Sequence, residues 1–412
     1  MADKYLVQEE SLTSIADAVR SKAGTSGDLV FPQGIVEGVN SIPSAAPNGT
    51  SWEIVRNNST RIGKVVRAMG LWVGVTWYGG PCYSLDGRDW ESTNVGGAYD
   101  CLYYANGIFV ASGSDVGISY STDGKTWKSS NLDTSKRAGY FLYEDGVWLA
   151  WDTVGGSTFG IHYSMDGKTW SQSNIATGNI QCIRYAKGLF VAASLIDGLY
   201  YSTDGITWTQ SNITGKATDA FFYNGLWIAG DANGSYYSED GKVWTKNDLL
   251  LNGIEGIYDT NRGYLIAAVK TSQYYNSILH YSTDGKNWTI CDVDKSKDFL
   301  GGGIITYGGG LFAMYSKSSS KYFYSSDGKS WTYVSAPWNS CAGMVYGNGV
   351  WVAANTNKAI YTSTDGVTWT RSMNEAKNAK GVICEDGVWL VYGSSVYYSP
   401  VWNSPSKEEE ER

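Results

Sequence analysis

Short apolar runs separated by glycine turns follow one another along most of the chain. One run leads into a turn, as Leu102–Ala105 does before Asn106-Gly107, and a second apolar run follows at once. Runs of this length, rich in β-branched and aromatic residues and bounded by glycine, predict strands. The second runs begin at Leu71, Ile108, Val147, Leu189, Leu226, Tyr264, Leu311, Val350 and Val388. The pattern therefore predicts nine hairpins of two strands each.

After most of these hairpins the chain repeats the phrase Ser-x-Asp-Gly-x-x-Trp. Asp-Gly between two extended runs is a strong hairpin signal, because glycine adopts a positive φ at little cost. The Ser and Asp side chains can cap N–H groups inside such a turn, and the Trp packs where the returning strand begins. We interpret the aspartates as structural turn residues, neither catalytic nor calcium-binding. They are Asp86, Asp123, Asp166, Asp204, Asp240, Asp284, Asp327 and Asp365.

A third strand enters the phrase and a fourth leaves it, so four antiparallel strands occupy about 39 residues, a spacing typical of propeller blades. Residues 48–52 repeat the second half of the phrase and residues 396–400 the first half. We expect the two ends to complete one blade, which would leave no free sheet edge. The sequence predicts an all-β fold, a closed β-propeller of nine four-stranded blades over residues 48–402, with the last blade completed by the N-terminal strand.

The phrase resembles the Asp-box of sialidases and sortilin-like propellers. In that motif one residue stands between Asp and Gly, whereas here Gly follows Asp directly. The resemblance covers residues 48–400 and implies the fold alone, because the motif is structural in its own families.

Residues 1–43 follow a different pattern. Leu12, Ile15 and Val19 fall on one helical face, and residues 31–42 predict a second, shorter amphipathic helix. Two short helices bury little area by themselves, so we expect this element to pack against a partner: its own propeller, another copy of the chain, or a different protein. Residues 44–47 are predicted to be a linker, and residues 403–412 a disordered acidic tail.

The segment Ser11–Arg20, followed by Gly27–Gly34, is similar to a segment common in tail and tail-fibre proteins of phages that infect Gram-positive bacteria. The likeness covers about 30 residues. It implies a virion tail, or a phage-derived tail-like particle, assembled in the cytoplasm of the bacterial host. Its implied partners are other tail proteins or further copies of the chain, bound through residues 1–43.

Charge and composition exclude several classes of protein. A net charge of −8 and a pI of about 5.0 argue against a nucleic-acid partner, which requires a basic surface. The chain has no apolar run of about 18 residues, so we expect no membrane insertion. Six Cys without a Cys-x-x-Cys pair, and two His at ordinary strand positions, predict neither a metal site nor a cofactor.

Candidate binding residues lie in the loops that differ between repeats. These loops join the second strand to the third and one blade to the next, and they are expected at the end opposite the repeated turns. Aromatic rings beside Asn and Asp suit sugar binding, although they could equally cap the blades. The candidates are Trp77, Tyr78, Trp151, Asp152, Tyr274, Tyr275, Asn276, Tyr315 and Trp338.

We expect a non-enzymatic receptor-binding protein that recognises a bacterial cell-surface glycan or protein through these loops. One alternative is a structural tail or baseplate component without receptor binding. The other is a sialidase-like glycan hydrolase, which would require an arginine cluster and a pair of carboxylates. The residues available for that chemistry are Arg56, Arg61, Arg137, Asp152, Asp197, Asp231 and Glu255.

Overall fold

The computed structural model describes most of the repeat region, within one compact unit, Gly49–Pro400. The described residues are 52–56, 61–132, 137–153, 159–176, 179–231, 234–247, 254–270, 277–293, 304–315 and 320–399. All regular elements there are β-strands, and no helix in these ranges could span a membrane. The helical element predicted for residues 1–43, the linker at 44–47 and the tail at 403–412 lie outside the described residues.

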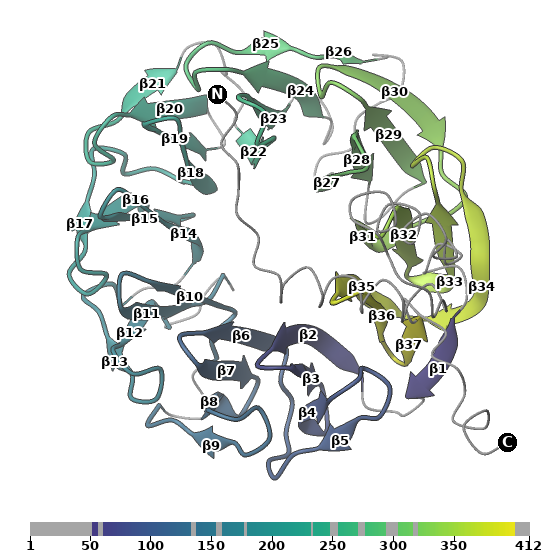
Figure 1. The fold of residues 1–412 in the computed structure, drawn as a ribbon. Coiled ribbons are helices and arrows are strands. Elements are labelled where there is room, and N and C mark those ends of the chain that lie inside the picture. The colour runs from purple at the N-terminus through teal and green to yellow at the C-terminus, as the bar shows by residue number, and fades with distance from the viewer. Residues whose placement is uncertain are drawn as a thin grey trace, which may run out of the picture. The chain divides into compact units, whose positions relative to one another are not determined.

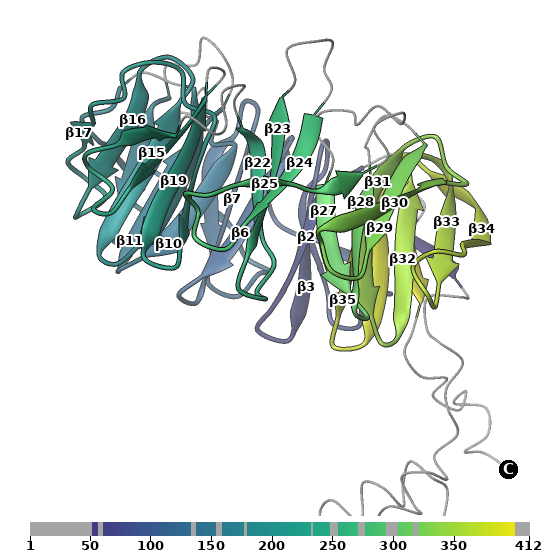
Figure 2. The same ribbon diagram turned by 90° about the horizontal axis from the view of Figure 1, so that it is seen from above.

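Nine β-sheets follow one another around a ring with a central opening (Figure 1). Eight sheets have four strands and one has five. Within each sheet the successive strands step from the opening to the periphery (Figure 1), and they cross the thickness of the ring (Figure 2). The fold is a nine-bladed β-propeller, so the predicted all-β class and the count of nine four-stranded blades are confirmed.

In each blade the first strand lines the central opening and the last lies at the periphery. In that order, blades 1 to 3 consist of β2 Ile62–Ala68, β3 Leu71–Thr76, β4 Gly80–Ser84 and β5 Glu91–Ser92; β6 Cys101–Ala105, β7 Ile108–Gly113, β8 Gly117–Ser121 and β9 Lys128–Ser129; and β10 Tyr140–Glu144, β11 Val147–Trp151, β12 Ile161–Ser164 and β13 Ser171–Gln172. Blades 4 to 6 consist of β14 Ile180–Ala186, β15 Leu189–Ser194, β16 Gly198–Ser202 and β17 Thr209–Gln210; β18 Asp219–Tyr223, β19 Leu226–Asp231, β20 Gly234–Ser238 and β21 Thr245–Asn247; and β22 Ile254–Asp259, β23 Leu265–Lys270, β24 Ser277–Ser282 and β25 Thr289–Ile290. Blades 7 to 9 consist of β27 Ile304–Gly308, β28 Leu311–Tyr315, β29 Lys321–Ser325 and β30 Ser330–Ser335, with β26 Asp292–Val293 as a fifth strand; β31 Cys341–Gly347, β32 Val350–Asn355, β33 Asn357–Ser363 and β34 Thr370–Lys377; and β35 Ala379–Glu385, β36 Val388–Gly393, β37 Val396–Ser399 and β1 Glu53–Arg56.

Blade 9 combines strands from both ends of the propeller sequence. β1 pairs antiparallel with β37, with Glu53 opposite Tyr398 and Ile54 opposite Tyr397. β1 therefore occupies the outer position that the fourth strand takes in the other blades. The predicted half-phrase at residues 48–51 lies outside the described residues.

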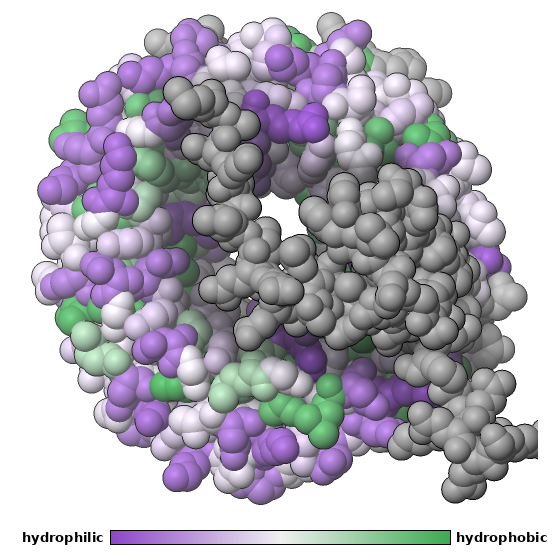
Figure 3. All heavy atoms as spheres, viewed as in Figure 1, coloured by the Kyte–Doolittle hydropathy of each residue, from purple (hydrophilic) through white to green (hydrophobic). Residues whose placement is uncertain are grey.

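The hydrophobic core lies between the blades, in nine clusters that each combine residues of two neighbours. In one cluster Val110 of blade 2 packs with Trp148 of blade 3, and in another Trp72 of blade 1 packs with Leu390 of blade 9. Apolar side chains on the described part of the face in Figure 3 form small groups among polar ones. Most of the apolar surface is thus used to join neighbouring blades.

The cysteines belong to this core. All six are thiols outside any disulfide; five of them are buried and Cys384 is half-buried. Burial in the cluster between blades 2 and 3 raises the pKa of Cys101 to about 11. These side chains therefore act as small hydrophobic groups.

The repeated phrase forms a hydrogen-bonded turn. In blade 4, Ser202 Oγ donates to Asp204 Oδ1 at 2.8 Å and accepts the N–H of Gly205 at 2.9 Å. Asp204 Oδ1 also accepts the N–H groups two and three residues further on, both at 2.8 Å. The same Ser-to-Asp hydrogen bond occurs at Asp86, Asp123, Asp166, Asp240, Asp284, Asp327 and Asp365.

Glycine at the tip of this turn meets two requirements. Gly285 has a φ of 74°, a conformation that other residues adopt only with strain. A Cβ at this position would also lie 2.5 Å from Ile228 Cδ1 of the preceding blade. The turn therefore packs directly against its neighbour, and its sequence is constrained by both the backbone and the blade interface.

Acid is expected to destabilise the propeller between about pH 4 and pH 2. Partial burial would raise the pKa of Asp284, but hydrogen bonds from Asn287, Lys286 and Ser282 outweigh burial and lower it to about 2. The unfolded chain has an ordinary Asp pKa of about 3.9. A carboxylate with a lower pKa in the folded state stabilises that state above the unfolded value, and this stabilisation disappears as the pH falls through the folded pKa. Denaturant unfolding at a series of pH values measures the effect.

The matched variant for this experiment is Asp284→Asn, which keeps the side-chain shape and removes one titrating group. Its unfolding free energy should depend less steeply on pH over the same interval. A wild-type free energy that stays constant from pH 5 to pH 2 would contradict the expectation.

Asparagine side chains connect neighbouring blades near their outer edges. Asn131 of blade 2 donates from Nδ2 to the Trp170 carbonyl of blade 3 at 2.9 Å, and its Oδ1 accepts the Trp170 N–H at 2.7 Å. The same pair of bonds joins Asn94 to Trp127, Asn174 to Trp208 and Asn212 to Trp244. Between blades 6 and 7 the connection is made by backbone atoms and not by an asparagine side chain, because β26 pairs in parallel with β30. We call the Asn contacts the asparagine clamps.

Replacing Asn131 with alanine is expected to lower the free energy of unfolding by about 1–3 kcal/mol, because the N–H and C=O of Trp170 both lose their partner. Ser129→Ala, at an exposed position of β9 in the same blade, should change it by less than about 0.5 kcal/mol. Urea unfolding of both variants tests the clamp. Equal effects of the two substitutions would show that the clamp contributes nothing measurable.

Candidate functional site

Two kinds of loop leave the blades at opposite ends. Because neighbouring strands are antiparallel, the first-to-second turn and the Asp-Gly turn lie at one end of each blade. The loops from the second strand to the third, and from blade to blade, lie at the other end. We call this second end the variable-loop face. Polar and aromatic side chains gather on it at blades 9, 1, 2 and 3.

Trp77 and Tyr78 form the tip of the loop between β3 and β4. Their exposed fractions are 37% and 72%. Thr76 Oγ1 donates to the Gly80 carbonyl and accepts the Gly79 N–H, both at 2.8 Å. The loop is therefore fixed by its own hydrogen bonds, and both rings are presented to solvent. Their predicted part in ligand binding stays a prediction.

One side of the Trp77 indole lies over Gly63 of its own blade, near residues of blades 2 and 9. A Cβ added at Gly63 of its own blade would lie 2.9 Å from Trp77 Nε1 and 3.8 Å from Asp100 Cα of blade 2. Lys380 of blade 9 places Nζ 5.5 Å from the ring centroid, a cation–π distance. Trp77 thus occupies the junction at which blade 9 meets blade 1.

An ion-pair network continues from this junction towards blade 3. Arg137 Nη2 lies 2.8 Å from Asp100 Oδ2, and Arg137 Nη1 lies 3.9 Å from Asp152 Oδ1. Burial alone would lower the pKa of Arg137, but the hydrogen bond and charge of Asp100, followed by the charge of Asp152, raise it. The guanidinium therefore stays cationic and fixes the positions of both carboxylates.

A second exposed ring lies beside this network. Tyr140, 49% exposed, stacks on Trp151 with ring centroids 5.6 Å apart and an angle of 15° between the planes. Trp151 is only 4% exposed, so it supports Tyr140 from below and offers no face to a ligand. This corrects the expectation for Trp151, since the ring available on the surface is that of Tyr140.

Together these side chains form a continuous set, which we call the aromatic arc. It combines the exposed rings of Trp77, Tyr78 and Tyr140 with two cations, Arg137 and Lys380, and the half-buried carboxylate of Asp100. Asp152 is only 5% exposed, so it holds Arg137 from below, and its predicted contact with a ligand is corrected in the same way as that of Trp151. Flat rings next to groups that donate and accept hydrogen bonds are suited to the faces and hydroxyls of sugars. Its members are Trp77, Tyr78, Asp100, Arg137, Tyr140 and Lys380.

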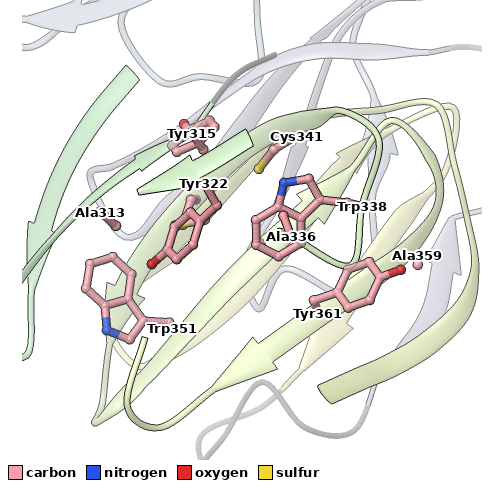
Figure 4. Close-up of a cluster of buried hydrophobic side chains, with 11 residues drawn as sticks. Ala313, Tyr315, Tyr322, Ala336, Trp338, Cys341, Trp351, Ala359 and Tyr361 are labelled. Atoms are coloured by element: carbon pink, nitrogen blue, oxygen red, sulfur yellow. The ribbon is translucent and has the colours of Figure 1, made fainter. Parts of the chain in front are cut away.

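Two further predicted residues are buried between blades 7 and 8. Tyr315 is 5% exposed and Trp338 is 1% exposed, and both belong to the cluster drawn in Figure 4. Trp338 lies between Tyr322 and Tyr361, with ring centroids 5.8 Å and 5.5 Å away. These two rings pack the core, so their assignment to a binding surface was wrong.

The remaining three predicted residues are Tyr274, Tyr275 and Asn276. All three lie outside the described residues, so their placement in a binding loop stays a prediction.

The carboxylates of Asp100 and Asp152 both face the guanidinium of Arg137. The side chains of Asp231 and Glu255, also considered for hydrolysis, lie outside those described. Among the described residues no group of three or more His, Cys, Asp or Glu side chains could hold a metal ion.

Comparison with known proteins identifies the fold. No protein-family model matches the chain, and no curated protein sequence matches it. Its structure is similar to that of Sqt1 from Saccharomyces cerevisiae, with 9% identity and a TM-score of 0.51 over 86% of this chain and 99% of that one. It is also similar to the computationally designed Ika8 protein, with 8% identity and a TM-score of 0.50 over 84% and 98% of the two chains. At such identities the likeness shows the β-propeller fold alone.

Proposed function

We propose that the protein is a receptor-binding component of a phage tail or tail-like particle, and that it recognises a glycan on the bacterial cell surface through the variable-loop face. The observation that carries this proposal is the aromatic arc, in which two sets of exposed rings flank a fixed ion-pair network. Preorganised rings lose little conformational entropy on binding, which favours the binding of a sugar. No cofactor and no catalytic step are part of the proposal.

The setting in a phage tail rests on the sequence of residues 11–34, which resembles a tail-protein segment. In this proposal residues 1–43 attach the propeller to other tail proteins or to further copies of the chain. Several propellers on one particle would bind a surface with high avidity, even if each site binds weakly.

Binding to purified cell-wall polysaccharide tests the function directly. The full chain should be retained by the polysaccharide and should release no reducing ends during incubation. Release of reducing ends would support the hydrolase alternative, and complete absence of retention would support a purely structural tail component.

The chemical class of the receptor is tested on whole cells. Periodate oxidation, which destroys sugar diols, should abolish binding of the full chain, and protease treatment of the cells should leave it intact. The reverse pattern would identify a protein receptor.

A further inference from the structure

Three cations gather around the exposed rings of the Trp77 loop. Arg61 is exposed, and its backbone carbonyl accepts the Trp77 N–H at 3.0 Å. Lys64 is also exposed and directly follows Gly63, over which the Trp77 indole lies. Lys380 of blade 9 places its Nζ 5.5 Å from the centroid of the same ring. We call Arg61, Lys64 and Lys380 the basic cluster.

The basic cluster is not neutralised by carboxylates of the described residues. None of its three side chains takes part in the ion pairs found there. Asp100, the carboxylate of the aromatic arc, is bound by Arg137 at 2.8 Å instead. The chain as a whole carries a net charge of −8. The basic cluster is therefore a local positive charge on an acidic protein, and such a charge attracts anions.

The two lysines approach the loop from different blades. Along β2, Val65 packs in the cluster shared with blade 9, whereas Val66 packs in the cluster shared with blade 2. Lys64 alternates with Val65, so it lies on the side of blade 1 that faces blade 2. Burial raises the pKa of Cys101 in blade 2, and the positive charge of Lys64 counteracts this rise. The cluster thus extends from blade 9, across blade 1, to the side of blade 2.

The contact that holds Lys380 is one that a ligand can replace. Its ammonium group lies against the Trp77 ring, and a cation–π contact at an exposed site is weaker than a hydrogen bond between two charged groups. A carboxylate or phosphate of a ligand would therefore draw the ammonium group away from the ring. The same movement would uncover the ring for stacking against a sugar. A neutral sugar offers no such exchange.

We propose that the receptor bound by the aromatic arc is an acidic glycan, whose carboxylates or phosphates pair with Lys64 and Lys380 while its sugar rings stack on Trp77 and Tyr78. This inference rests on the function proposed above and adds the charge of the receptor to it. Salt screens the attraction between exposed charges, so binding should weaken as salt is added.

Removal of the acidic groups from immobilised cell-wall polysaccharide tests the proposal. Carbodiimide-mediated reduction converts carboxylates to alcohols, and hydrofluoric acid removes phosphate esters; the sugar left on the support is quantified after each treatment. At least one treatment should abolish saturable binding of the full chain. Loss after reduction alone would identify carboxylates as the acidic groups, and loss after hydrofluoric acid alone would identify phosphates.

Two further outcomes of this experiment separate the inference from the function on which it rests. Full binding after both treatments would overturn the acidic receptor and leave recognition of a glycan intact. Absence of binding to the untreated polysaccharide would contradict the proposed function itself, and the inference with it.

Replacement of both lysines, Lys64→Gln with Lys380→Gln, should weaken binding to the untreated polysaccharide by about tenfold or more, because charged hydrogen bonds are lost. It should also make binding less sensitive to salt. Lys64→Arg with Lys380→Arg restores both charges and should recover at least part of the lost affinity. Binding of wild-type strength by the glutamine variant would overturn the proposal.

The matched control is Lys128→Gln with Lys246→Gln, which has the same net charge as the glutamine variant. It removes two exposed lysines from the outermost strands of blades 2 and 5. Its binding should equal that of the wild type. Equal weakening in the control and in the glutamine variant would show that only the total charge matters, and would overturn the assignment to the basic cluster.

Single-stranded DNA distinguishes an acidic glycan from polyanions in general. DNA added at the same concentration of phosphate should not displace the polysaccharide, because it lacks the sugars that stack on the exposed rings. Displacement by DNA would show that the basic cluster binds any polyanion, and would overturn the proposal.

Discussion

Replacing Trp148 with alanine is expected to lower the free energy of unfolding by about 3–5 kcal/mol, because it leaves a large cavity in a close-packed interface. Trp148 is completely buried between blades 2 and 3. Its ring lies 6.1 Å from that of Tyr103 in blade 2 and 5.0 Å from that of Tyr143 in its own blade. Both contacts and the packing between the two blades would be lost. Urea unfolding followed by tryptophan fluorescence and circular dichroism measures the change.

Trp148→Phe is the matched control. Phe already occupies the equivalent position in blades 2, 4 and 7, as Phe109, Phe190 and Phe312. Nε1 of Trp148 has no hydrogen-bond partner in the described part of the chain, so the smaller ring loses no hydrogen bond. The control should therefore cost much less than alanine. A similar, small cost for both substitutions would show that packing between blades contributes little to stability.

Joint replacement of Trp77 and Tyr78 by alanine is expected to abolish most binding to the cell surface. Central aromatic residues of binding sites commonly contribute about 2 kcal/mol or more each, which corresponds to about 30-fold in affinity per ring. Both side chains are exposed on a loop held by backbone and Thr76 hydrogen bonds, so their removal should leave the fold unchanged. Binding to whole cells or to purified wall polysaccharide, measured beside the Tm of each variant, tests the expectation.

Leu85→Ala provides the control within the same blade. Leu85 is 67% exposed but lies in the Asp-Gly turn, at the end opposite the variable-loop face. Its replacement should leave binding unchanged. Full binding by the Trp77 and Tyr78 variant would exclude this part of the arc, whereas loss of binding in the Leu85 variant would locate the receptor site on the other end of the blades.

The sequence predicted only some of the side chains that are exposed on the variable-loop face. The loop of Trp77 and Tyr78 is short and begins directly after a strand, and both rings are exposed as a loop position suggests. The predictions for Tyr315 and Trp338 failed because a residue at the end of a strand or in a loop can still turn inwards between blades. The sequence shows that such a residue is aromatic, but whether it faces solvent depends on the neighbouring blade.

The asparagine clamps and two residues of the aromatic arc were not predicted, because their partners are distant in sequence. The pattern Trp-x-x-Ser/Thr-Asn recurs after Trp90, Trp127, Trp170 and Trp208 and could have indicated the asparagine clamps. However, Asn131 contacts a residue 39 positions further on, and only the ring geometry brings the two together. Tyr140 and Lys380 were missed for the same reason, since each acquires its role from an aromatic ring on another strand or blade.

By itself the sequence determined the repeat, the four strands of each blade and the number of blades. These depend on local physics, namely the strand propensity of short apolar runs and the tight turn that Asp-Gly permits. The tertiary structure alone decided which aromatic rings face solvent and which carboxylates are held by Arg137. Both depend on contacts between residues that are far apart in the chain and become neighbours only when adjacent strands and blades pack together.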